Sequence, residues 1–173
     1  MQRSFVQEYL SSNCLRQLYD YWSSARNGRN MPTRSNIDPL KIPKLLPHVA
    51  LTDVFHDPLR FRYRLIGTWI TNLAERDVTG RWLDEELYGD GTEQMLWAFR
   101  ACADNSEPLA VREKVQFADK DWVMVEALFL PISESGDVVD ILLSGVDRVG
   151  PEVSRPSQGH SFVLDLSAGH HDR

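Results

Sequence analysis

The chain has 173 residues, of which 42% are hydrophobic and 25% are charged. This composition is typical of a soluble globular protein that is long enough to bury a core without disulfide or metal cross-links. The formal net charge of −6 disfavours non-specific binding to nucleic acid, so we expect no nucleic-acid partner. Because no apolar run is long enough to span a bilayer and the N-terminus lacks a signal-peptide pattern, we expect no membrane insertion and a cytoplasmic location.

An amphipathic helix is predicted for residues 6–25, because apolar residues recur there at steps of three and four. Gly28 follows in the position of a helix stop. The apolar stripe is rich in aromatic residues and must be buried, either on the rest of the domain or against a second copy of the chain. The residues expected to pack this helix are Leu10, Leu18, Tyr21 and Trp22.

A long proline-rich connection, residues 26–47, separates this helix from the first predicted strand, residues 48–56. Within the connection, Asp38 and Pro39 indicate a capped short turn of helix. A second strand follows at residues 60–67, and the short spacing between the two strands predicts a hairpin. Strict alternation in the second strand places Phe61, Tyr63 and Leu65 on one face and Arg62, Arg64 and Ile66 on the other.

The rest of the chain begins with helical patterns and continues with extended ones. Short helical segments are predicted at residues 68–75 and 84–88, and a longer amphipathic helix begins at Thr92 and ends before Pro108. Three more strands follow, joined by turns short enough for antiparallel hairpins, at residues 109–118, 122–132 and 138–149. This order of elements predicts an α+β fold with an antiparallel sheet.

We therefore expect three segments along the chain. Residues 1–47 hold the helix and the proline-rich loop, which pack on the domain or on a second copy. Residues 48–149 form the core. Residues 150–173 are rich in Gly, Pro, Ser and His, and they form a tail that is either flexible or docked by its one apolar patch, Phe162–Leu166.

The order of the elements is similar to that of a PAS domain, in which short helices are inserted between the second and third strands of a five-stranded antiparallel sheet. A more specific pattern runs through the sequence as Tyr21-Trp22, Arg26, Gly28-Arg29, Pro32, Arg34, Ile37-Asp38-Pro39, Leu46-Pro47, Phe61, Tyr63-Arg64-Leu65, Gly67-Thr68, Asp77 and Thr79-Gly80. Together these residues resemble the single-domain PAS subfamily common in alphaproteobacteria, over residues 10–149. The sequence departs from that pattern at Ala74-Glu75, where small residues or glycine are usual.

The resemblance implies a PAS-like fold, with short helices on one face of the five-stranded sheet and the amphipathic helix at the N-terminus. It also implies a bacterial sensory or protein-interaction module that is often dimeric and has a cavity between the sheet and its helices. It does not imply catalysis, and a likeness of fold does not by itself assign a ligand.

None of the cofactors that PAS domains carry is expected. A flavin photosensor would have a reactive cysteine in an Asn-Cys-Arg motif, where this chain has Asn72-Leu73-Ala74. A haem sensor would have an axial histidine on a helix over the sheet, whereas His48 and His56 flank the first strand and the other histidines lie in the tail. These two histidines are too far apart along a strand to share a metal ion. Because Cys14 and Cys102 also lack metal-ligand spacing, we predict neither a cofactor nor a metal.

If a cavity binds a small molecule, alternate sheet residues and the apolar faces of the helices should line it. The register of each later strand stays open: residues 109–118 present either Glu113 and its alternate residues or their neighbours to the helices, and residues 122–132 present either Met124, Glu126 and Leu128 or Val123, Val125 and Phe129. A tightly packed core is the alternative to a cavity. The lining candidates are Tyr63, Leu65, Ile70, Leu73, Leu83, Met95, Phe99, Val115, Phe117 and Met124. The polar anchor candidates, chosen because a buried charge needs a partner, are Arg64, Arg112 and Glu126.

The sequence therefore predicts a cytoplasmic PAS-type sensory or regulatory module without catalytic activity and without an output domain of its own. It would act as a homodimer that binds an unidentified signalling protein or a small molecule. One alternative is a small α+β enzyme, which would need an inward-facing Asp–His or Glu–Tyr pair with perturbed acidity. The other alternative is a sensor that carries haem or another prosthetic group.

Overall fold

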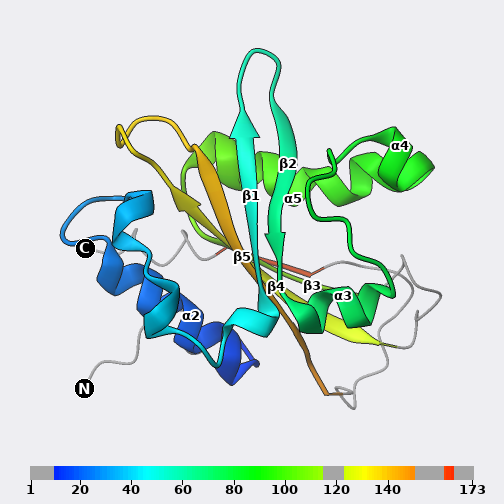
Figure 1. The fold of residues 1–173 in the computed structure, drawn as a ribbon, viewed down its shortest axis with the longest axis horizontal. Helices are drawn as coiled ribbons and strands as arrows, with labels where there is room; N and C mark the ends of the chain where they lie inside the picture. Colours follow the sequence, from blue (N-terminus) through cyan, green and yellow to red (C-terminus); the bar gives the residue numbers. More distant parts are fainter. Residues whose placement is uncertain (1–9, 115–122, 151–161, 166–173) are drawn as a thin grey trace.

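The structure is a computed structural model that describes residues 10–114 and 123–150, and the backbone of residues 162–165. One antiparallel sheet lies between helices that cover both of its faces (Figure 1). Helix α2 covers the face that we call the back face, and helices α3, α4 and α5 cover the front face. The predicted segment boundaries at residues 47 and 149 stay predictions.

The sheet has the strand order β2-β1-β5-β4-β3-β6, and each neighbouring pair is antiparallel. The five predicted strands are all present, so the antiparallel α+β fold is confirmed. Strand β6 comes from the predicted tail and pairs with β3, so this part of the tail is docked. The strands are β1 (Val49–Phe55), β2 (Arg60–Ile66), β3 (Leu109–Lys114), β4 (Met124–Ile132), β5 (Ile141–Arg148) and β6 (Phe162–Asp165).

The helices occupy most of the predicted positions. Helix α2 begins at Asn13, because Ser12 has extended backbone and its hydroxyl caps the helix by accepting the N–H of Leu15 at 3.1 Å. Residues 6–9 of the predicted helix lie outside the described residues. Helix α3 ends at Ala74, and Glu75 takes a left-handed conformation with φ +57°, at the position where the sequence departs from the PAS subfamily. The helices are α2 (Asn13–Ala25), α3 (Thr68–Ala74), α4 (Glu85–Tyr88) and α5 (Thr92–Asn105), with 3-10 turns at Arg34–Asn36, Pro39–Lys41, Leu46–His48 and Gly89–Gly91.

The apolar stripe of α2 packs on the back face of its own sheet. Leu10, Leu18 and Trp22 are buried there, and the indole N–H of Trp22 donates to the carbonyl of Pro131 at 2.9 Å. The helix comes so close to β5 that a Cβ atom at Gly145 would lie 2.6 Å from Cδ2 of Leu18. The stripe is therefore buried on its own domain, and no second copy of the chain is needed to cover it.

Tyr21 on the same helix ties down the proline-rich loop. Its half-buried hydroxyl accepts the backbone N–H of Asp38 at 2.6 Å and lies 3.1 Å from the carbonyl of the same residue. The Asp38 carboxylate accepts the N–H of Leu40 at 3.0 Å, and Pro39 begins the 3-10 turn. The predicted capped turn is therefore present.

A β-bulge at Arg64 changes the alternation of β2. The register of β1 against β2 skips this residue, so two residues of β2 oppose one of β1 and the following side chains change faces. Tyr63 and Ile66 both reach the front face, whereas Leu65 is 44% exposed. The prediction that Leu65 shares a face with Tyr63 is therefore wrong, and the bulge is the reason.

Candidate ligand-binding cavity

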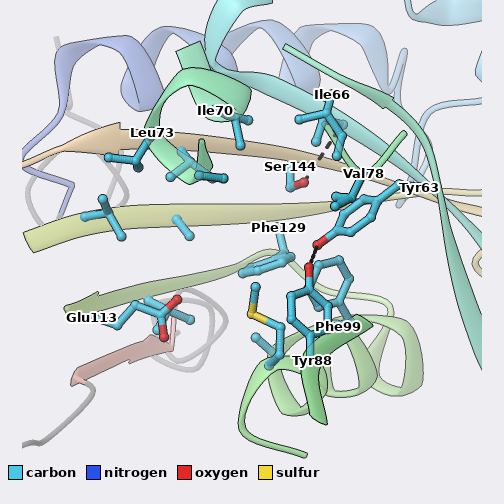
Figure 2. A pocket seen from close by; sticks show the side chains of 18 of the residues that line it. Tyr63, Ile66, Ile70, Leu73, Val78, Tyr88, Phe99, Glu113, Phe129 and Ser144 are labelled. Carbon is cyan, nitrogen blue, oxygen red and sulfur yellow. Dashed lines mark hydrogen bonds between the residues drawn. The ribbon is translucent and has the colours of Figure 1, made fainter. Parts of the chain in front are cut away.

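A cavity of about 100 Å³ lies on the front face, between the sheet and helices α3, α4 and α5 (Figure 2). Its sheet wall includes short side chains on central strands, those of Ala50, Ala127 and Ser144. Ile70 and Leu73 of α3 form part of the opposite wall. Since the sheet side chains are too short to reach the helices, the space between the layers stays open at this point.

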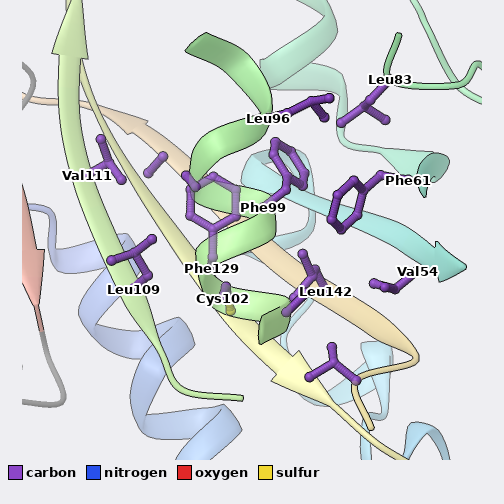
Figure 3. Close-up of a cluster of buried hydrophobic side chains, with 14 of the residues drawn as sticks. Val54, Phe61, Leu83, Leu96, Phe99, Cys102, Leu109, Val111, Phe129 and Leu142 are labelled. Atoms are coloured by element: carbon purple, nitrogen blue, oxygen red, sulfur yellow. The ribbon is translucent and has the colours of Figure 1, made fainter. Parts of the chain in front are cut away.

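The neighbouring part of the front face is filled (Figure 3). Phe99 of α5 stands at the boundary, with its ring centroid 5.6 Å from that of Phe61 and 4.9 Å from that of Phe129. Such offset and edge-on contacts are the favoured aromatic geometries. The front layer therefore contains both a packed core and a cavity, which the sequence had presented as alternatives.

Two tyrosines bring hydroxyl groups together inside the cavity. The hydroxyl oxygens of Tyr63 and Tyr88 lie 2.7 Å apart, and both residues line the space. Burial, reinforced for Tyr63 by the neighbouring Tyr88, raises the pKa of both phenols, so both carry their protons at neutral pH. One hydroxyl donates to the other, which leaves the proton of the second hydroxyl for a further acceptor.

Glu113 enters the same cavity from β3 (Figure 2). Burial raises the pKa of its carboxyl group, because the charged form loses its water. Among the described residues, this carboxyl group makes no hydrogen bond and no ion pair. The guanidinium of Arg76, which is exposed and also lines the cavity, lies 5.7 Å from the ring centre of Tyr88.

The predicted lining residues fall into three groups. Those that the structure places around the cavity are Tyr63, Ile70, Leu73, Met95 and Phe99, and their part in binding stays a prediction. Those that lie elsewhere are Leu65, Leu83 and Met124, because the bulge turns Leu65 away, Leu83 packs in the filled core, and Val125 rather than Met124 faces the helices. Those that fall outside the described residues are Val115 and Phe117.

The three predicted polar anchors do not line the cavity. Arg64 is at the bulge, where its Nε lies 2.7 Å from Oδ1 of Asp53. Arg112 and Glu126 oppose each other on β3 and β4 and form an ion pair, with Nε 2.8 Å from Oε2, beneath the start of α2. The observed pairing directs Glu113 of β3 and Val125 of β4 to the front face, so the opposed Arg112 and Glu126 point to the back face.

Four lining residues that matter for the site were not among the predicted lining or anchor residues: Ile66, Arg76, Tyr88 and Glu113. Glu113 belonged to one open register but was not chosen as an anchor. Tyr88 ends the short helix predicted at residues 84–88. The only signal for its inward side chain is that it is the one aromatic residue of this short helix, which begins with the acidic run Asp84-Glu85-Glu86. No local signal in the sequence indicates that Arg76 and Ile66 reach the cavity.

A chain of contacts connects the cavity wall to the N-terminal end of α2. Trp69 of α3 stacks on His48, with ring centroids 4.6 Å apart. Nδ1 of His48 lies 3.0 Å from the carbonyl oxygen of Val146 and 3.4 Å from Oδ1 of Asp147. The other carboxylate oxygen of Asp147 accepts the hydroxyl of Ser12, the capping residue of α2, at 2.6 Å. Glu126 accepts the backbone N–H of Ser12 at 3.2 Å. The helix start is therefore held by side chains from the sheet.

Both cysteines are free thiols, with Cys14 half-buried and Cys102 buried. Burial, reinforced by Asp147, raises the pKa of Cys14 to about 11, and burial also raises the pKa of Cys102, so both are protonated thiols at neutral pH. Within residues 10–114 and 123–150, no three His, Cys, Asp or Glu side chains are grouped to hold a metal ion. In the same ranges, no helix has the length and the apolar character required to cross a membrane.

Comparison with known families identifies one match. The family model described as a PAS domain matches residues 10–145, a range that begins just before α2 and ends within β5. It therefore includes both walls of the cavity as well as the helix on the back face. Searches among curated proteins and among solved structures found no match.

Proposed function

The chain belongs to the PAS domain family. On that premise we propose that it is a cytoplasmic regulator that binds a small molecule in the front-face cavity. The bound molecule would alter the packing of α2, and a signalling protein would recognise the altered packing. A sensory or regulatory role is what membership of this family supports in general. The small molecule, the signalling protein and the cellular location are the specific parts of the proposal.

The cavity is the observation that carries the proposal. Protein interiors are close-packed, with few voids larger than a water molecule, and an apolar pocket with a few convergent polar groups is the first candidate for a small-molecule site. Here a space of about 100 Å³ lies beside a well-packed aromatic cluster. It combines an apolar lining with a hydroxyl pair and a carboxyl group, the mixture of many apolar and few polar groups that is typical of small-molecule sites.

Helix α2 is the element that we propose for output. A ligand that displaces α3 would move Trp69, and through His48 and Asp147 it would change the contacts of Ser12 at the start of α2. Such a ligand shifts the protein between two packings of α2 only as far as it binds one of them better. Because the apolar stripe of α2 is already covered, the proposed homodimer would have to use a different surface.

The enzyme alternative gains one observation, since Glu113 and Tyr63 are an inward Glu–Tyr pair with raised pKa values. The two are not hydrogen-bonded to each other in the structure; the partner of Tyr63 is Tyr88. A general acid–base pair needs direct or single-water contact with the reacting group. We therefore propose that these groups anchor a ligand and that the chain is not an enzyme.

Nuclear magnetic resonance with a small-molecule extract tests the proposal. Amide signals of cavity residues should shift on addition of extract from the cells in which the protein occurs. The Ala127→Leu variant, whose larger side chain would fill the space between sheet and α5, should show no such shifts. Shifts that are the same in both proteins, or confined to residues outside the cavity, would contradict the proposal.

A further inference from the structure

We propose that the ligand of the cavity is a small hydrophobic amine, whose ammonium group pairs with the carboxylate of Glu113 while its hydrocarbon body fills the apolar space. This inference rests on the proposed function and adds the chemical class of the ligand. It follows from three features of the cavity: an unpaired acid, a set of aromatic rings, and a small volume.

The first feature is the state of Glu113. A carboxylate that is largely removed from water is unstable unless it binds a proton or pairs with a cation. Within the described residues, no cation is paired with it. Arg76, the cation that also lines the cavity, has its guanidinium over the ring of Tyr88 instead. A ligand with an ammonium group would supply the missing partner, whereas an anionic ligand would be repelled.

The second feature is the set of rings around the space. Tyr63, Tyr88, Phe99 and Phe129 all line it, and the ring of Phe99 lies 6.3 Å from that of Tyr63 and 4.9 Å from that of Phe129. Aromatic faces attract cations, most strongly where water is excluded. The oxygens of the two tyrosine hydroxyls can also accept N–H groups. Rings combined with one carboxylate suit an ammonium better than a neutral or anionic group.

The third feature is size. An engineered cavity of about 150 Å³ holds one benzene molecule, so by the same proportion a cavity of about 100 Å³ holds about four non-hydrogen atoms, and a five-carbon body needs a slight opening of α3. Among the described residues, Glu113 is the one carboxyl group in the lining, so it can pair with one ammonium group. Branched or cyclic aliphatic amines of this size, or a small aromatic amine after slight opening of α3, therefore match the cavity, and long chains do not.

Three probes with one carbon skeleton test the inference: isoamylamine, isoamyl alcohol and isovalerate. Each is titrated into the full chain at about pH 8, where the amine is cationic, and binding is followed by amide shifts of cavity residues. We expect the amine to bind at least about tenfold more tightly than the alcohol, because the ammonium adds an attraction between opposite charges to its hydrogen bond, whereas the alcohol offers the hydrogen bond alone. Isovalerate should bind most weakly.

The matched variants are Glu113→Gln and, as a control on an exposed acid, Glu107→Gln. The first should bind amine and alcohol with affinities within about threefold of each other, and amide shifts of Ile70 and Phe99 on addition of the alcohol show that its cavity still binds. The second should keep the wild-type preference. If the alcohol binds as tightly as the amine, or if Glu113→Gln keeps the amine preference, the inference is wrong and ligand binding in the cavity still stands. If no probe shifts the cavity signals, or if Ala127→Leu binds all three as well as wild type, the proposed function fails with it.

Discussion

Replacing Glu126 with alanine should detach the start of α2 from the sheet and lower the stability of the whole domain. This side chain is fully buried, and its carboxylate accepts the backbone N–H groups of Ser11 and Ser12 at 3.1 and 3.2 Å and the Nε of Arg112 at 2.8 Å. The substitution leaves one cation and two backbone donors without this acceptor.

The magnitude follows from the degree of burial. Removing one partner of a buried ion pair costs about 3–5 kcal/mol. The side chain of Arg112 keeps 19% exposure and Ser11 is at the surface, so water can replace part of what is lost. We therefore expect a loss near the lower end of that range, about 3 kcal/mol, from a domain whose total stability is of the order of 5–15 kcal/mol.

Urea unfolding followed by circular dichroism gives the free energy of unfolding, and native-state hydrogen exchange reports α2 separately. The amides of α2 should exchange faster in Glu126→Ala than those of β4 and β5. Glu107→Ala, which removes an exposed carboxylate, should change the stability by less than about 0.5 kcal/mol. A loss below about 1 kcal/mol for Glu126→Ala, together with unchanged exchange of α2, would refute the reasoning.

Two further predictions concern the packing of α2 and the acid in the cavity. Gly145→Ala places a methyl group 2.6 Å from Cδ2 of Leu18 and 2.7 Å from Cδ2 of Leu15, so it should cost about 1–3 kcal/mol in urea unfolding; an unchanged midpoint would contradict the position of α2 on the back face. Glu113→Gln should not change the melting temperature near pH 4, where the carboxyl group is largely protonated in both states, and should raise it at pH 8. The sign follows because the raised pKa of Glu113 makes the unfolded chain lose its proton first as pH rises, which lowers wild-type stability from the unfolded pKa up to the folded pKa. Calorimetry at the two pH values measures this difference, and a variant that is less stable than wild type at pH 8 would contradict it.

The element order could be predicted because each element carries its own periodicity. The stripe of α2 at steps of three and four, and the alternation of apolar residues in the strands, survive in the sequence whatever the tertiary contacts are. Turn and cap residues such as Asp38-Pro39 act locally and were also predictable. What covers the stripe of α2 was not predictable, since a sheet and a second copy of the chain bury the same residues equally well.

The cavity was harder to predict because it depends on the register. No glycine or proline marks the bulge at Arg64, yet this single extra residue exchanges Leu65 for Ile66 on the front face. Charged residues stand on both faces of β3 and β4, so alternation alone could not decide the inward acid, and Glu126 rather than Glu113 was the predicted anchor. Only the pairing of the strands shows that Glu126 of β4 contacts the start of α2 and that Glu113 of β3 lines the cavity.

Native mass spectrometry of the full chain, purified from the cells in which it occurs, tests ligand binding in the cavity most directly. The account predicts a mass increment from one small molecule per chain that is removed by gentle activation, and that is absent from Ala127→Leu prepared in the same way. It also predicts that the released molecule is basic, and the same spectrum reports whether the chain is a homodimer. Wild-type protein that carries no small molecule, or a molecule that stays bound to Ala127→Leu, would contradict the account.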